Sequence, residues 1–137
     1  MPPALTPALA VDYVRELSAD VRAVVVLGAR GELLAGPPAL AASARALLTA
    51  AAGAGELEAV TPAGVVCAAR SSHHAAVAVC GRFALPGVTR QDLRVALAAL
   101  DGAPLAQAVA IPAGPPDRAV QHAAEALISA VQRDLEA

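Results

Sequence analysis

Both cysteines and two of the three histidines of this chain fall within one short segment, VVCAARSSHHAAVAVCG, residues 65–81. The cysteines are Cys67 and Cys80, and the adjacent pair His73 and His74 lies between them. Two thiolates and two imidazoles are ligand types that hold zinc in a tetrahedral site. The segment can also be a β-hairpin with the histidines at its tip, so the position of these side chains in the fold decides between a metal site and a hairpin.

A hairpin that turns about His73-His74 brings Cys67 directly opposite Cys80 and places both thiols on one face of the sheet. With a strand rise of about 3.3 Å per residue, the histidines then lie more than about 15 Å from the cysteines. Four ligands cannot converge from these positions, so we predict that one chain binds no metal. The hairpin leaves two other possibilities open, a cross-strand disulfide and histidines that titrate at an interface.

The other residues that could do chemistry form no catalytic or cofactor-binding pattern. No serine lies in a Gly-x-Ser-x-Gly elbow. The turn GARG, residues 28–31, is too short to cradle a phosphate with its backbone. The carboxylates are scattered along predicted helix faces, where solvation is their ordinary role. We therefore predict no catalytic residue, no cofactor and no enzyme activity.

The composition excludes further classes of protein. A chain of 137 residues suits one domain with its own core. The ten basic residues are all arginine and are spread among twelve acidic ones, for a net charge of −2, so no charged stripe indicates nucleic acid or an acidic membrane surface. No apolar run reaches the roughly 18 residues that cross a bilayer, and the first residues lack the basic leader of a secretion signal. We expect a cytoplasmic protein with reduced thiols.

Hydrophobic periodicity predicts three helices and five strands before residue 102. The expected apolar face of the first helix, which Thr6 caps, consists of Leu9, Tyr13, Val14 and Leu17. The expected order begins with a helix over 7–18, strands over 21–27 and 32–35, and a helix that follows Pro37-Pro38 and ends at Gly53. Three strands follow, one in ELEAVTPAG (56–64) and the others over 64–70 and 75–82. The last helix of this part starts at a capping box, Thr89 to Asp92, and ends at Asp101-Gly102.

Both faces of the central strands are apolar. In the strand over 64–70, Val66 and Ala68 point to one face of the sheet, whereas Val65, Cys67 and Ala69 point to the other. A half-exposed sheet would alternate polar and apolar residues. The pattern therefore indicates a sheet that helices cover on both sides.

A separate amphipathic helix is expected at the end of the sequence, over residues 117–137, after a proline-rich linker over 102–116. A stripe of this kind is rarely left in water, so the helix must dock either on the body of the protein or on a partner. The predicted stripe consists of Val120, Ala124, Leu127, Ile128, Val131 and Leu135.

The order of elements, with VRAVVVLGARGELLAG (residues 21–36) and the segment 65–81, resembles the Roadblock/dynein-light-chain family over about residues 5–101. The most telling piece is an apolar strand, a glycine-centred turn and a short apolar return; where the family often has an acidic residue before the turn glycine, this chain has Arg30 before Gly31. The resemblance implies an α/β (α+β) three-layer sandwich, with a five-stranded antiparallel sheet between the second helix and the first and third. The Roadblock-like domain would then span residues 1–101.

Members of this family are typically non-enzymatic homo- or heterodimers, and bacterial members often bind Ras-like small GTPases and modulate their nucleotide cycle. The resemblance thus implies a homodimeric bacterial interaction module that regulates or scaffolds a small GTPase. The back face of the second helix carries Ala42, Ala46 and Ala50, and small residues at this spacing let another helix approach closely, so we take them as the candidate dimer interface.

The alternative is a small-molecule sensor domain of the profilin/GAF-like sandwich type. A sensor should keep a cavity lined by a few convergent polar groups. The predicted interior is Val, Ala and Leu almost throughout, and this favours the interaction module.

Overall fold

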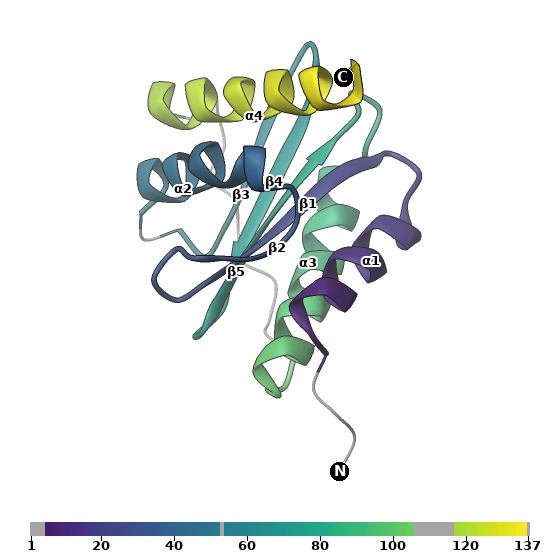
Figure 1. Cartoon of the computed structure of the whole chain (residues 1–137), viewed down its shortest axis with the longest axis vertical. Helices are drawn as coiled ribbons and strands as arrows, with labels where there is room; N and C mark the ends of the chain where they lie inside the picture. Colours follow the sequence, from purple (N-terminus) through teal and green to yellow (C-terminus); the bar gives the residue numbers. More distant parts are fainter. Residues whose placement is uncertain (1–4, 53, 106–116, 137) are drawn as a thin grey trace.

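A five-stranded antiparallel sheet forms the middle layer of the structure, a computed structural model that describes residues 5–52, 54–105 and 117–136 (Figure 1). The strands lie in the order β2-β1-β5-β4-β3. Neighbouring strands pair antiparallel throughout. Their bounds are β1 Val21–Gly28, β2 Leu33–Ala35, β3 Glu56–Thr61, β4 Gly64–Arg70 and β5 His74–Cys80.

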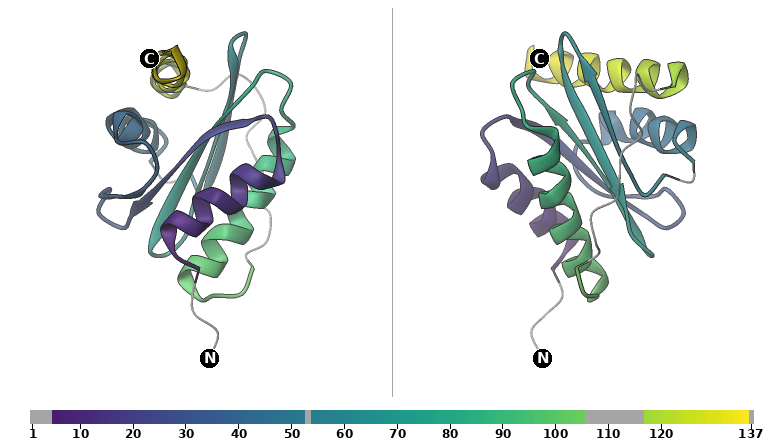
Figure 2. Two further views of the ribbon diagram at one scale, coloured as in Figure 1. Left: turned by 45° about the vertical axis from the view of Figure 1, so that its right-hand side comes forward. Right: turned by 180° about the vertical axis from the view of Figure 1, so that it is seen from behind.

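Helices cover both faces of this sheet (Figures 1 and 2). Helices α1 (Pro7–Leu17) and α3 (Pro86–Asp101) lie on one face. The 3₁₀ turn η1 (Pro38–Leu40) and helices α2 (Ala41–Ala50) and α4 (Arg118–Glu136) lie on the other. The predicted three-layer α+β sandwich with a five-stranded antiparallel sheet is therefore confirmed, and α4 joins α2 in one of its outer layers.

Side chains of the central strands alternate between two apolar cores, as their sequence predicted. Val66 and Ala68 of β4 belong to the core beneath α2 and α4. Val65, Cys67 and Ala69 belong to the core beneath α1 and α3. Because strand side chains alternate with a period of two, one apolar run supplies both cores at once.

Helix α1 begins where predicted, since the Thr6 side chain accepts a hydrogen bond from the Leu9 amide at 3.2 Å. Its buried face, however, consists of Ala10, Val11 and Val14. Of the predicted apolar face, Leu9, Tyr13 and Leu17 are exposed, so only Val14 was placed correctly. Small residues let this helix lie close to the sheet, and the larger side chains are left on its outer face.

Helix α3 begins at Pro86, three residues before the predicted capping box at Thr89. Proline at the first helical position fixes φ near its helical value, and it starts the helix without a side-chain cap. Thr89 is consequently buried inside the first turn, where its side chain hydrogen-bonds Cys80. The helix ends as predicted at Gly102, whose φ of +64° is the left-handed conformation of a C-terminal cap.

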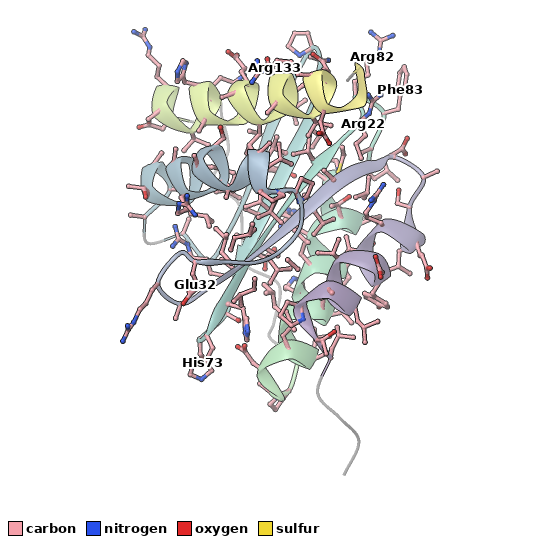
Figure 3. The ribbon with its side chains drawn as sticks, in the orientation of Figure 1. Arg22, Glu32, His73, Arg82, Phe83 and Arg133 are labelled. Atoms are coloured by element: carbon pink, nitrogen blue, oxygen red, sulfur yellow. The ribbon has the colours of Figure 1, made fainter. Side chains whose placement is uncertain are left out.

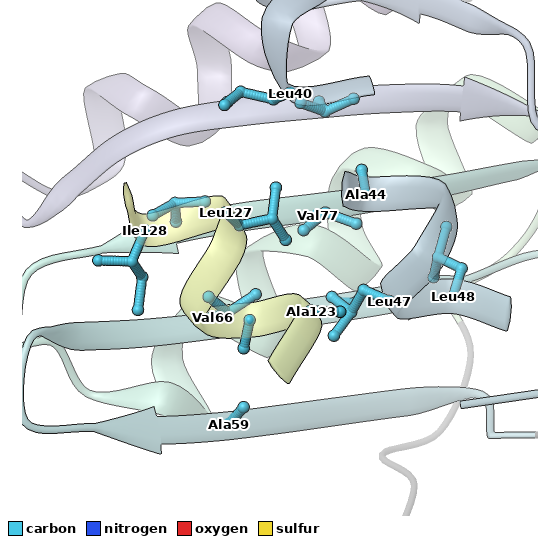
Figure 4. Close-up of a cluster of buried hydrophobic side chains, with 14 of the residues drawn as sticks. Leu40, Ala44, Leu47, Leu48, Ala59, Val66, Val77, Ala123, Leu127 and Ile128 are labelled. Carbon is cyan, nitrogen blue, oxygen red and sulfur yellow. The ribbon is translucent and has the colours of Figure 1, made fainter. Parts of the chain in front are cut away.

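Helix α2 buries Ala44, Leu47 and Leu48 in the core, next to Leu40 of η1 (Figure 4). The helix ends at Ala50. Gly53, the predicted end, lies outside the described residues, as does most of the predicted linker, residues 106–116.

Helix α4 docks on the body of the protein, beside α2 and across β3, β4 and β5 (Figures 1 and 4). Leu127 and Ala124 are completely buried, and Ala123 and Leu127 belong to the same buried cluster as Leu47 of α2 (Figure 4). The helix thus covers sheet residues such as Val66. All predicted stripe residues from Val120 to Val131 are buried; the side chain of Leu135 is outside the described part.

Candidate interaction surface

The β4–β5 hairpin has a register that differs from the predicted one. Cys67 faces Ala78, and Cys80 faces Val65. The hairpin turns at Ser72-His73, because the Ser71 amide donates to the His74 carbonyl at 2.8 Å and the Ser71 hydroxyl accepts from the His74 amide at 3.2 Å. The prediction that Cys67 lies directly opposite Cys80 was wrong by two residues. A shift of two keeps every side chain on its face, so both thiols still share one core.

The two histidines have different surroundings. His73 is exposed in the turn (Figure 3), as expected of a tip residue. His74 begins β5, and its Nδ1 contacts the carboxylate of Asp101 at the end of α3. His74 therefore makes a tertiary contact and is not a solvated residue at the tip of the hairpin. Burial opposes ionisation of Asp101, but hydrogen bonds from the His74 and Ser71 side chains outweigh it and lower the pKa of Asp101 below its ordinary value.

Cys67 and Cys80 are almost completely buried as free thiols. Burial raises the pKa of Cys80 to about 11 despite the opposing hydrogen bond with Thr89. Burial also raises the pKa of Cys67, and the nearby Cys80 adds to the effect. Within residues 5–52, 54–105 and 117–136, no group of three or more His, Cys, Asp or Glu side chains is placed to hold a metal ion.

We predict that neither thiol reacts in the folded protein. Residues diagonal to each other on paired strands have Cα atoms about 7–8 Å apart, which is longer than a disulfide allows. With both pKa values raised, little thiolate is present at pH 8, so reaction with Ellman's reagent should be at least about 100-fold slower than in guanidinium. An Ala99→Cys variant, with an exposed position on α3, should gain one fast thiol. Two fast thiols in the native wild type, or a Cys67–Cys80 disulfide seen by mass spectrometry, would contradict the hairpin geometry.

The three alanines proposed as a dimer interface lie along one side of α2. Ala42 and Ala46 are exposed, whereas Ala50 is half-buried and contacts the core beneath α2 and α4. Arg45 and Thr49 are exposed beside them. Ala42, Ala46 and Ala50 form a surface that is here called the α2 face. It is narrow, its side chains are small, and no large side chain lies at its centre.

A buried ion-pair cluster that the sequence analysis missed fixes the edge strand β3 to α3. Glu56, only 5% exposed, receives a hydrogen bond from Arg90 Nη1 at 3.1 Å. Arg94 Nε also lies 3.1 Å from Glu56, and Arg90 Nε lies 3.5 Å from Glu58. Charged side chains on the inner face of an edge strand discourage unwanted strand pairing. The residues are far apart in the sequence, so no local pattern identified them.

The sequence analysis also missed a cavity of about 480 Å³ at the end of the sheet where the β1–β2 and β4–β5 turns lie. Its walls come from three separate segments: the β1–β2 turn, the second half of α2, and the β4–β5 turn. Residues that come from three separate segments follow no regular spacing in the sequence, so no sequence pattern predicts such a site. Of the two apolar cores, it adjoins the one beneath α2 and α4, through Leu27, Leu48 and Ala75.

No helix within the described residues is both long and apolar enough to cross a membrane. No protein-family model and no curated protein matches the sequence.

Among solved structures, a Roadblock/LC7 domain from Streptomyces avermitilis is similar with a TM-score of 0.57 and 12% identity, over 68% of this chain and 92% of that domain. A second structure of a Roadblock/LC7 domain from the same organism is similar with a TM-score of 0.53 and 16% identity, over 64% of this chain and 91% of the other. The sheet and the helix layers described above are thus those of a Roadblock/LC7-like fold.

Proposed function

We propose that this protein is a non-enzymatic, homodimeric interaction module that regulates or scaffolds a Ras-like small GTPase in the bacterial cytoplasm. The observation that carries the proposal is the Roadblock/LC7-like fold combined with the exposed α2 face. Small side chains at positions 42, 46 and 50 allow two helices to approach closely, and a twofold axis through Ala46 would place equivalent residues against each other. The GTPase would be recognised by the dimer as a whole.

Ala46→Glu should convert the dimer to a monomer. In a close helix–helix contact the substitution places two carboxylates together without partners, and burying unpaired charge costs several kcal/mol. A cost of this size is enough to dissociate a dimer of micromolar affinity. Multi-angle light scattering measures the mass of the particle, and circular dichroism checks that the variant is folded.

Ala99→Glu is the matched control, because Ala99 is an exposed alanine of α3 on the opposite face of the sheet. It should leave the mass unchanged. A folded Ala46→Glu protein that stays as dimeric as the wild type would refute the α2 interface.

The proposed regulation of a GTPase needs a separate test. Release of a fluorescent GDP analogue and GTP hydrolysis by a Ras-like GTPase are measured, each with and without this protein. No change in either rate and no complex on gel filtration would argue against that GTPase as a partner.

A further inference from the structure

We infer that the cavity between the β1–β2 turn, α2 and the β4–β5 turn binds a small phosphorylated molecule through Arg30, Arg45 and Arg70. This inference is independent of the proposed dimer and of any GTPase partner. It rests on the position, charge and hydrogen bonding of the cavity's side chains.

The cavity has the size of a ligand site. Its volume of about 480 Å³ falls within the usual range for small-molecule pockets, about 300–1,000 Å³. Its lining includes the apolar residues Leu27, Leu48 and Ala75 and the hydroxyl-bearing residues Thr49 and Ser72. Figure 3 labels Glu32 and His73, which mark the two turns on either side of the cavity.

The residues that line the cavity carry a concentrated positive charge. Three arginines belong to the lining, and none of the lining residues is acidic. Two carboxylates adjoin the lining, but both are engaged: Glu32 accepts a hydrogen bond from the Arg30 amide at 3.1 Å, and Asp101 contacts His74. Among residues 5–52, 54–105 and 117–136, no carboxylate forms an ion pair with Arg30, Arg45 or Arg70.

Two of the arginines are held in place by the backbone and keep donors for a ligand. Arg45 Nη1 donates to the Gly31 carbonyl at 3.2 Å. Arg70 Nη2 donates to the Leu48 carbonyl and, at 3.5 Å, to that of Ala51. These carbonyls end α2 and carry the negative end of its dipole, which Arg70 offsets. Each guanidinium has five N–H donors, so both retain most of them.

The chemistry of these donors favours a phosphoryl group. A guanidinium presents parallel N–H groups that match phosphate oxygens in pairs, and two to three such cations balance the charge of a phosphate monoester. The net charge of the whole chain is −2, which works against long polyanions but leaves a local positive site open to a small anion. The remaining volume accommodates an organic group.

The test is a titration of the ¹⁵N-labelled full chain with inorganic phosphate, glycerol 3-phosphate and glycerol, at fixed pH and ionic strength. Glycerol 3-phosphate should give saturable amide shifts in the β1–β2 turn and at Ser71 and Ser72, with a lower Kd than inorganic phosphate, and glycerol should give none. Arg45→Gln should raise the Kd at least about 10-fold, since a hydrogen bond between charged groups is lost. Arg30→Gln should raise it as well, and the Arg30 side chain makes no structural hydrogen bond within the described residues.

Arg133→Gln is the control, because Arg133 is an exposed arginine at the opposite end of the molecule (Figure 3). It should leave the Kd unchanged. Shifts that do not saturate, or an equal loss of affinity in Arg133→Gln and Arg45→Gln, would overturn the site. Binding of inorganic phosphate as tight as that of glycerol 3-phosphate would overturn the assignment to an organic phosphate. Because Arg45 lies beside the α2 face, light scattering on Arg45→Gln separates a loss of the phosphate site from a loss of the dimer.

Discussion

Removal of α4 by truncation after Pro116 should strongly destabilise the fold and make the remaining chain self-associate. The helix packs on β3, β4 and β5, and without it residues such as Ala59 and Val66, both fully buried, would meet water. Leu127 is 0% exposed, and loss of a leucine from such a site costs about 2–5 kcal/mol. Leu127→Ala alone should therefore lower the melting temperature by on the order of 10 °C.

Differential scanning calorimetry and light scattering measure these two effects. Ser129→Ala is the matched control, since Ser129 lies on the exposed side of the same helix, and it should change the stability by less than about 0.5 kcal/mol. A truncated chain with the melting temperature and the oligomeric state of the full chain would show that α4 is a free tether and that its docked position is wrong.

Gly36→Ala should be the most harmful single methyl addition in the turns. Gly36 has φ of +110°, and an added Cβ would lie 2.4 Å from the Val24 carbonyl oxygen and 3.0 Å from Val25 Cα. The obstruction is backbone of the neighbouring strand β1, which cannot move aside as a flexible side chain would. We expect a loss of at least about 2–3 kcal/mol in the free energy of unfolding, measured by denaturant titration.

Gly87→Ala is the opposite case on the same chain. Gly87 lies in the first turn of α3, and an added Cβ would meet nothing within 4 Å. This substitution should be neutral or should stabilise by about 0.4–1 kcal/mol, because alanine restricts the unfolded chain. Equal stability of the two variants would contradict the close contact between β2 and β1.

The architecture could be predicted from the sequence to the extent that it depends on periodicity. Apolar residues on both faces of the strand over 64–70 required helices on both sides, and the structure has them. The predictions that were wrong, the buried face of α1 and the register of the hairpin, depend on a choice between similar residues. In α1, apolar residues occur on both sides of the helix, and Ala10 and Val11 occupy the buried face in place of Leu9 and Tyr13. At the hairpin, hydrogen bonds between Ser71 and His74 select the register: the Ser71 amide donates to the His74 carbonyl, and the Ser71 hydroxyl accepts from the His74 amide.

The candidate sites were less accessible to prediction. The spacing of Ala42, Ala46 and Ala50 is local to one helix, so the sequence could indicate a common face. By contrast, the cavity brings Arg30, Arg45 and Arg70 together from three segments. Such residues come close together only in the folded chain, and the sequence alone does not show it.

Disulfide trapping at Ala46 tests the proposed dimer most directly. The native thiols are buried, so an Ala46→Cys variant would have one accessible thiol, and a residue near a twofold axis meets its own copy in the partner. Mild oxidation should give a covalent dimer on non-reducing gels, whereas Ala99→Cys at the same concentration should stay largely uncrosslinked. An Ala46→Cys protein that is dimeric by light scattering but forms no more covalent dimer than Ala99→Cys would contradict the proposed interface.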